Sequence, residues 1–253
     1  MGKEMSEKLF FEFIDKRETY LSKNTFFEPE NFEWTNSIET QYQLINNELI
    51  SFYTTHKNDF HPYFVNELVN ESGKWRSFGF YFWGMRADTR ICSYFRETIT
   101  LLKTIPNLVS ASISVMEPNS EIKPHYGDTN AIYRCHLGLK IPGKLPEIGF
   151  QVGYEKRSWE EGRFLIFNDA AYHKAWNSSE QSRIILILDV IRPEFEHKKL
   201  GICVRVQSII LSQHLIKHYP KIRRIIKFCT IQLIIRFYIW CSLKTFKRKS
   251  LWL

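Results

Sequence analysis

Three of the eight histidines stand where a metal site could form. His125 follows Pro124 in a predicted loop just before an alternating segment, His136 lies within that segment, and His173 follows the turn-rich residues 168–172. In a jelly roll, two histidines on opposite strands can face each other inside the barrel mouth. Such a pair binds Fe(II) and leaves positions open for a co-substrate and oxygen. These histidines therefore point to non-haem iron chemistry.

A carboxylate is missing from the position where such a site usually has one. Most non-haem iron sites combine two histidines with one carboxylate, and the first pair reads His-x-Asp. Here glycine stands two residues after His125, as Gly127, and Asp128 comes one residue late. We interpret Asp128 as a turn residue and leave its assistance in metal binding open. Asp169, four residues before His173, is a further candidate that could orient a ligand or a bound water.

Short strands must position these residues. After Pro106 the chain forms short alternating segments separated by turns, with no helical pattern between them. This spacing predicts an antiparallel sandwich or barrel. In one of the segments Arg134 and His136 fall on the same face. The predicted strands are residues 111–116, 134–141, 150–154, 163–167 and 183–191.

Two helices are predicted ahead of these strands. The first runs from Ser37, a candidate cap, to about His56, and the second covers Arg90 to Lys103. Each carries an apolar stripe at helical spacing. We expect them to buttress one face of the barrel, which makes the fold mainly β, of the α+β class.

The charge distribution separates a C-terminal tail from the rest of the chain. After Glu196 there are 13 lysine and arginine residues and no acidic one, whereas the preceding part has 22 basic and 27 acidic residues. We therefore predict a globular domain over residues 1–195 and a basic amphipathic helical tail over residues 196–253. For residues 202–249 three readings stay open, namely an anionic membrane surface, a helix folded back on the core or used in dimerisation, and, least favoured, nucleic acid.

Several ordered motifs together resemble the aspartyl/asparaginyl β-hydroxylase family. The resemblance covers about residues 25–195 and is specific because the motifs occur in order at matching spacing. The motifs are Ser114-Val115-Met116-Glu117-Pro118, Pro124-His125-Tyr126-Gly127, Arg134-Cys135-His136-Leu137-Gly138-Leu139, Trp159-Glu160-Glu161-Gly162, Phe167-Asn168-Asp169-Ala170-Ala171-Tyr172-His173, and the strand from Arg183 through Asp189-Val190.

The resemblance implies a double-stranded β-helix and a hydroxylase that uses Fe(II), O2 and 2-oxoglutarate. In the eukaryotic branch of the family a glycine stands at the carboxylate position, and this chain follows that branch. His125 and His173 would then be the protein ligands of the metal. The residues at the family's 2-oxoglutarate-binding positions are Ser114, Arg134, His136 and Arg183. Arginine suits this task because it pairs with a carboxylate through two hydrogen bonds.

The cysteines and the N-terminus bear on location. The five cysteines show no CxxC spacing, which favours reduced thiols in a cytoplasmic protein. The N-terminus is charged from Lys3 and has no apolar segment of a secretory signal, although Gly2 and Ser6 fit the loose myristoylation pattern. We expect a cytoplasmic protein, with a peripheral position at the inner face of a membrane as an open alternative.

Three functional hypotheses remain. The first is hydroxylation of an unactivated carbon, with the β-carbon of an Asp or Asn residue favoured by the resemblance, whether free, peptidyl or carrier-bound. The second takes a membrane lipid acyl chain as the substrate, because of the basic tail. The family's lipid A acyl hydroxylases keep an Asp two residues after the first histidine. This chain has Gly127 at that position, which counts against that close identity. The third is a non-catalytic binding protein that has kept the fold.

Overall fold

The computed structural model describes residues 8–12, 14–15, 24–63, 66–87, 92–219, 221 and 228–247. The myristoylation pattern at Gly2 lies outside these residues.

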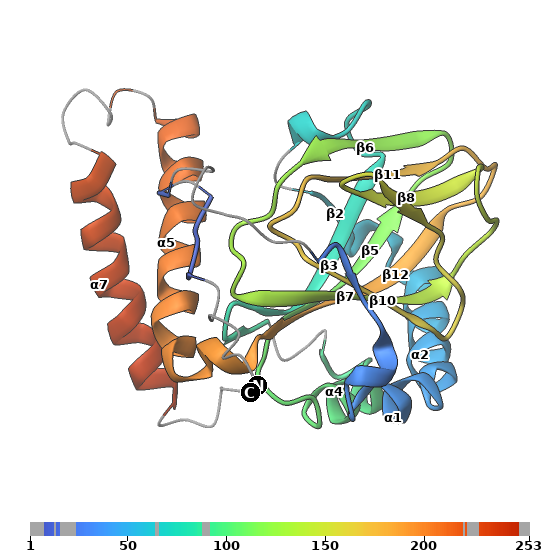
Figure 1. The fold of residues 1–253 in the computed structure, drawn as a ribbon, viewed down its shortest axis with the longest axis horizontal. Coiled ribbons are helices and arrows are strands. Elements are labelled where there is room, and N and C mark those ends of the chain that lie inside the picture. Colours follow the sequence, from blue (N-terminus) through green and yellow to red (C-terminus); the bar gives the residue numbers. More distant parts are fainter. Residues whose placement is uncertain are drawn as a thin grey trace, which may run out of the picture.

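Two antiparallel sheets face each other across the centre of the molecule (Figure 1). The large sheet has the order β1-β10-β7-β12-β5-β3-β2, with β4 paired to β3. Its strands are β1 (Phe26–Phe27), β2 (His61–Pro62), β3 (Trp75–Phe82), β4 (Met85–Arg86), β5 (Leu108–Met116), β7 (Ile132–Lys140), β10 (Phe164–Phe167) and β12 (Arg183–Ile191). The small sheet has the order β6-β11-β8-β9. Its strands are β6 (Ser120–His125), β8 (Ile148–Val152), β9 (Glu155–Arg157) and β11 (His173–Asn177).

This arrangement confirms the predicted jelly roll, or double-stranded β-helix. β7 and β12 pair along their length at the centre of the large sheet, and β6 and β11 pair in the small one. All five predicted strands are present as β5, β7, β8, β10 and β12. The placement of His125 in a loop was wrong, because it is the last residue of β6.

Separate hydrophobic clusters form on the two faces of the large sheet. One fills the space between the sheets and includes Met116, Phe150, Trp159 and Phe167. The other lies between the large sheet and the N-terminal helices. Because strand side chains alternate in direction, one strand such as β12 supplies both clusters, with Ile185 on the inside and neighbouring residues outside. Apolar packing on both faces therefore holds the large sheet in place beneath the site.

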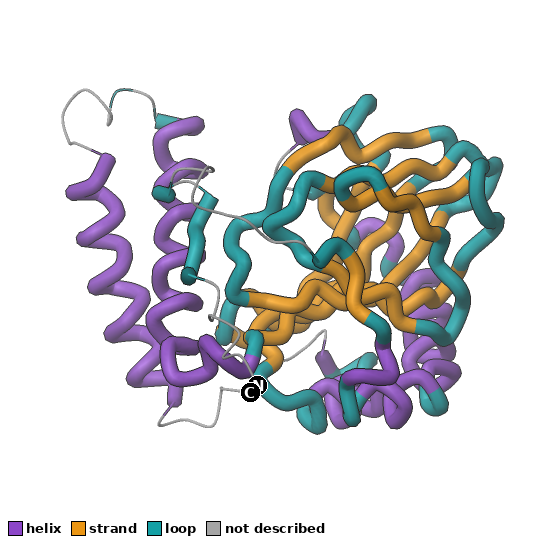
Figure 2. The backbone as a smooth tube through the Cα atoms, viewed as in Figure 1, coloured by secondary structure: helices purple, strands orange, loops and turns teal. Residues whose placement is uncertain are grey.

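The N-terminal helices cover the outer face of the large sheet, as predicted (Figures 1 and 2). They are α1 (Thr35–Glu39), α2 (Tyr42–Thr55) and α4 (Arg96–Leu102). The single helix predicted from Ser37 to His56 is broken at Thr40 and Gln41, and Ser37 lies inside α1 rather than capping it. Short 3-10 helices are η2 (Pro29–Asn31), η3 (Lys57–Asp59), η4 (Asn66–Leu68) and η5 (Pro193–Lys198).

Two long helices form a hairpin at the C-terminal end, α5 (Lys199–His218) and α7 (Phe228–Lys247). Ile202, Cys203 and Val206 of α5 are buried in a cluster with residues of the strands, including Val109 and Ile132. In Figure 1, α7 lies outside α5, on the side away from the barrel. α5 thus folds back on the core. Within the described part of the chain, no helix combines the length and the apolar character needed to cross a membrane.

Candidate active site

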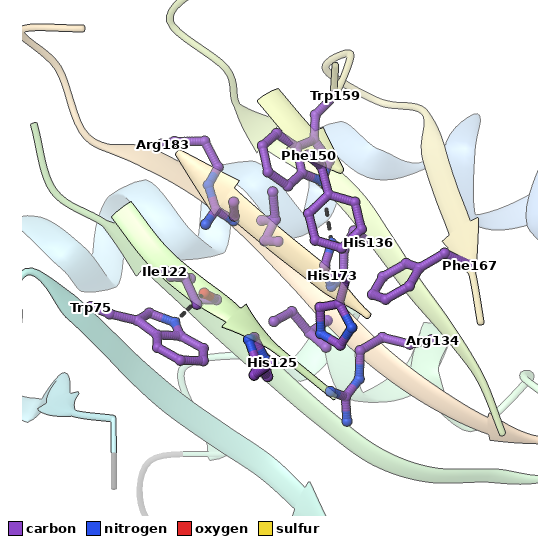
Figure 3. Close-up of a pocket in the computed structure, with 14 residues that line it drawn as sticks. Trp75, Ile122, His125, Arg134, His136, Phe150, Trp159, Phe167, His173 and Arg183 are labelled. Carbon is purple, nitrogen blue, oxygen red and sulfur yellow. Dashed lines mark hydrogen bonds between the residues drawn. The ribbon is translucent and has the colours of Figure 1, made fainter. Parts of the chain in front are cut away.

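A pocket between the two sheets gathers side chains from distant parts of the chain (Figure 3). Six of the predicted site residues line it, namely Ser114, His125, Arg134, His136, His173 and Arg183. In the view of Figure 3, Arg183 and Arg134 lie at opposite ends of the group and the three histidines lie between them. The alternation of β5, β7 and β12 turns the polar residues of these strands inward, where the apolar side chains of the small sheet surround them.

His125 and His173 are directly opposite each other on β6 and β11. Their ring centroids are 4.2 Å apart. The Nδ1 atom of each ring lies 2.8 Å from a backbone carbonyl oxygen, that of Lys123 for His125 and that of Ala171 for His173. Because a carbonyl oxygen only accepts hydrogen bonds, both Nδ1 atoms carry the proton, and both Nε2 atoms keep a lone pair. Burial lowers the pKa of both rings, strongly for His173, so they stay neutral.

Asp169 lies beside this pair and is completely buried. Its Oδ1 atom accepts a hydrogen bond of 2.6 Å from Nη1 of Arg134 and lies 3.8 Å from Nε2 of His173. Its backbone carbonyl accepts a hydrogen bond of 2.8 Å from the N–H of Gly127. Burial raises the pKa of Asp169 to about 7, although the charge of Arg134 opposes this rise. A carboxylate therefore stands close to the position that Gly127 leaves without one.

Arg134 is held by two carboxylates. Its Nε and Nη2 atoms donate to the two carboxylate oxygens of Asp189 at 2.7 and 3.0 Å, and Nη1 donates to Asp169. Burial disfavours the charge of Arg134, but the two carboxylates outweigh burial, so its pKa is well above the usual value. Sequence reasoning gave Asp189 no role in the site. Asp189 lies opposite Arg134 in the register of β12 against β7. Aligning these two predicted strands could therefore have identified Asp189 as a partner of Arg134.

Arg183, in contrast, is a buried cation that has no carboxylate partner among the residues described. Its side chain is 1% exposed, and its guanidinium lies over the ring of Trp159 at 4.6 Å from the centroid. Nη2 contacts the sulfur of Met116 at 3.3 Å, and Nε and Nη1 have no hydrogen-bond partner among the described residues. Burial alone lowers the pKa of Arg183 to about 9. A buried guanidinium in this state favours a bound anion.

Two neutral donors face the same pocket. Nε1 of Trp159 donates to Nδ1 of His136 at 3.3 Å, and since an indole N–H only donates, the proton of His136 is on Nε2. That Nε2 atom is buried and has no partner within the described residues. Nε1 of Trp75 donates to Oγ of Ser114 at 3.0 Å, which leaves the hydroxyl proton of Ser114 to donate elsewhere. One cation and two donors therefore await acceptor groups, and the carboxylates of 2-oxoglutarate fit this donor set.

Sequence reasoning missed the aromatic wall at one side of the site. Trp75, on the unpredicted strand β3, lines the pocket, and Tyr63 stacks on it with centroids 3.6 Å apart. The sequence marks Trp159 only as part of a motif, and in the structure it contacts both Arg183 and His136. Asp128 is half-buried and does not line the pocket, and burial raises its pKa to about 6. Among the residues that the structure describes, no group of three or more His, Cys, Asp or Glu side chains is arranged to hold a metal ion.

Comparison with known proteins identifies the family. A model of the aspartyl/asparaginyl beta-hydroxylase family matches residues 39–193. The chain belongs to this family. It is therefore a hydroxylase of the 2-oxoglutarate-dependent oxygenase type.

The relatives differ in size and in the substrates that their names give. The ornithine lipid ester-linked acyl 2-hydroxylase of Rhizobium tropici is 27% identical over 192 residues, which are 75% of this chain and 68% of that protein. The human aspartyl/asparaginyl beta-hydroxylase is 34% identical over 167 residues, 64% of this chain. The chain covers only 21% of that human protein.

Among solved structures, a Pseudomonas putida prolyl-4-hydroxylase is similar with a TM-score of 0.40 and 10% identity, over 67% of this chain and 94% of that one. The viral collagen prolyl hydroxylase of Paramecium Bursaria Chlorella virus-1, in its 2OG complex, has a TM-score of 0.32 and 12% identity, over 46% of this chain and 77% of that one.

Proposed function

We propose that the chain is an active Fe(II)- and 2-oxoglutarate-dependent hydroxylase whose metal is held by His125 and His173. The observation that carries the proposal is the fixed tautomer of the two rings, which leaves two Nε2 lone pairs in one pocket, beside a guanidinium that pairs with no carboxylate in the described part of the chain. Bound Fe(II) and 2-oxoglutarate would supply the oxidising power for hydroxylation with O2.

The chain's own residues divide the remaining work. His125 and His173 bind the metal through Nε2, and their carbonyl partners hold the rings in orientation. Arg183, Ser114 and His136 hold the co-substrate through the unpaired donors of the pocket. Arg134 would contribute its charge at the other end, where Asp189 fixes its guanidinium. Asp169, close to His173, would orient a ligand or a bound water and compensate the charge of the metal.

The substrate we favour is an Asp or Asn residue, free, peptidyl or carrier-bound, hydroxylated at its β-carbon. The support is the family match and the name of the human relative. A lipid acyl chain is the second candidate. It is supported by the Rhizobium tropici relative, whose match covers a larger share of this chain than that of the human protein.

An anaerobic titration tests the metal and co-substrate assignments. Adding Fe(II) and then 2-oxoglutarate to the metal-free protein should produce the visible charge-transfer band of a chelated iron–2-oxoglutarate complex. The band should be absent from His125→Ala and His173→Ala. An unchanged band in His173→Ala would remove the ligand assignment. A folded wild-type protein with neither the band nor stabilisation by 2-oxoglutarate would support the non-catalytic binding protein instead.

A substrate comparison separates the two candidates. The loaded enzyme would be incubated with Asp- and Asn-containing peptides and, separately, with an acylated ornithine lipid in detergent micelles. Mass spectrometry would then detect the gain of one oxygen atom, and release of succinate would report turnover. Oxygen gained by the peptides alone supports the first candidate, and oxygen gained by the lipid alone supports the second.

A further inference from the structure

The outward face of α7 exposes a continuous group of large apolar side chains. We call this group the α7 face, and it consists of Leu233, Ile234, Phe237, Tyr238 and Trp240. Phe237 and Tyr238 are 71% and 73% exposed, which is unusual for aromatic side chains in a structured helix. At 100° per residue the five positions fall on one side of the helix. The exposure is therefore a stripe and not a scatter of single residues.

The opposite side of α7 is anchored, so the stripe has a fixed orientation. Ile239 is buried and Ile235 partly buried, and both pack against Val204 and Leu200 of α5. α5 is in turn packed into the strands through Ile202 and its neighbours. Figures 1 and 2 show α7 on the outer side of this hairpin, away from the barrel. The α7 face therefore points out from the molecule, held by two layers of packing.

The charge around this face selects its partner. The segment after Glu196 carries 13 basic residues and no acidic one, and Arg236 lies at the edge of the α7 face, where its charge also acts on Arg205 of α5. An apolar stripe with tryptophan, tyrosine and phenylalanine, in a segment whose charged residues are all basic, is the composition of a helix that lies in the headgroup region of an anionic bilayer. A second copy of the chain is a poorer occupant, because its α7 would bring an equal positive charge to the contact.

We propose that the α7 face docks on the surface of an anionic phospholipid bilayer, with its apolar side chains among the upper acyl chains and its basic residues at the headgroups. This binding needs neither Fe(II) nor 2-oxoglutarate, so it can hold or fail independently of the hydroxylase activity. The barrel would then be tethered at the membrane through α5.

The test is vesicle flotation with the full chain. Phosphatidylcholine vesicles with about 30 mol% phosphatidylglycerol should carry the protein upward, and vesicles of phosphatidylcholine alone should not. Raising NaCl to about 0.5 M should weaken the binding, because it shortens the Debye length. Phe237→Ser/Tyr238→Ser should lower the partition coefficient at least about tenfold. Both side chains are mostly exposed, so the melting temperature should change little.

A control removes two exposed apolar side chains elsewhere on the surface. Leu44→Ser/Ile50→Ser alters two exposed apolar residues of α2, and it should leave flotation unchanged. Equal loss of binding in both double variants, or none in Phe237→Ser/Tyr238→Ser, would overturn the assignment of the α7 face. Failure of the wild-type chain to bind anionic vesicles would overturn the proposal that the partner is a bilayer. A dimer in sedimentation that Phe237→Ser/Tyr238→Ser dissociates would reassign the face to a contact between copies.

Discussion

The carboxylate of Asp169 occupies the space into which a side chain at Gly127 would project. A Cβ atom on Gly127 would come within 1.7 Å of Oδ2 of Asp169. With this backbone, a side chain at position 127 and the observed carboxylate of Asp169 cannot both be present. Glycine at the carboxylate position of the His-x-Asp pattern is the condition that lets the Asp169 side chain lie beside His173.

Gly127→Ala should destabilise the protein by about 1–3 kcal/mol, because either Asp169 or the β6 end must move. Asp169→Ala removes the clashing group, so the loss caused by Gly127→Ala should be smaller in that background. Urea unfolding of the four proteins of this double-mutant cycle measures the coupling. Gly79→Ala is the control, since a Cβ there meets nothing within 4 Å. Additive effects would contradict the exclusion.

The two arginines of the pocket should respond oppositely to loss of charge. Arg183→Met removes a buried cation that pairs with no described carboxylate. It should stabilise the protein without co-substrate by about 1–3 kcal/mol, while abolishing its stabilisation by 2-oxoglutarate. Arg134→Met leaves Asp169 and Asp189 unpaired and should cost about 3–5 kcal/mol. Differential scanning fluorimetry with and without 2-oxoglutarate measures both effects. Destabilisation in both variants would argue against an uncompensated charge on Arg183.

Trp159→Phe should weaken 2-oxoglutarate binding about tenfold while sparing Fe(II) binding. The substitution keeps an aromatic ring under Arg183 but removes the indole N–H that fixes the tautomer of His136. Isothermal titration with 2-oxoglutarate gives the affinity, and the metal content of the protein gives the second readout. Trp176→Phe is a suitable control, since its N–H donates to the carbonyl of Pro146 outside the pocket. Equal affinity in wild type and Trp159→Phe would remove this role.

The stability difference between Asp169→Asn and wild type should depend on pH. Burial raises the pKa of Asp169 from 3.8 to about 7, so the folded state binds its proton more tightly than the unfolded state does. The charge of Asp169 therefore costs stability above about pH 7, and this cost disappears as the pH falls towards about 4. From about pH 5 to about pH 8, the variant should gain stability relative to wild type, by at most about 4 kcal/mol. Urea unfolding of both proteins across this pH range measures the difference in their free energies of unfolding. A difference that does not change with pH would contradict the raised pKa of Asp169.

The strands that carry the co-substrate residues were predictable, and those on the other side of the pocket were not. Arg134 and His136 lie on a strand with clear alternation, so their shared face follows from period two. β6 has Lys123 and Pro124 near its end and looks like a loop, although the ladder with β11 makes it a strand. Trp75 lies on β3, whose aromatic run WRSFGFYF has no simple alternation because it packs on both faces.

The partners of the charged residues also lay beyond sequence reasoning. Asp189 could be read as part of a motif, but its double contact with Arg134 depends on the register of β12 against β7. The tautomer of His136 depends on Trp159, which is far from it in the chain. Such pairings arise from tertiary packing, which no local pattern encodes. The predicted division into a domain and a tail at residue 195 stays a prediction. In the structure, α5 of the tail shares a buried cluster with the strands.

The position of His125 at the end of β6 links metal loading to the dynamics of an edge strand. β6 is the outer strand of the small sheet, and its end at His125 is paired with β11. Such ends open and close locally more easily than central strands do. A metal bound by both His125 and His173 would link this end of β6 to β11 and hinder local opening. The amide hydrogens of β6 should then exchange slowly in the iron-loaded enzyme and quickly after the iron is removed by a chelator. The exchange rate of this one strand would therefore report whether iron is bound.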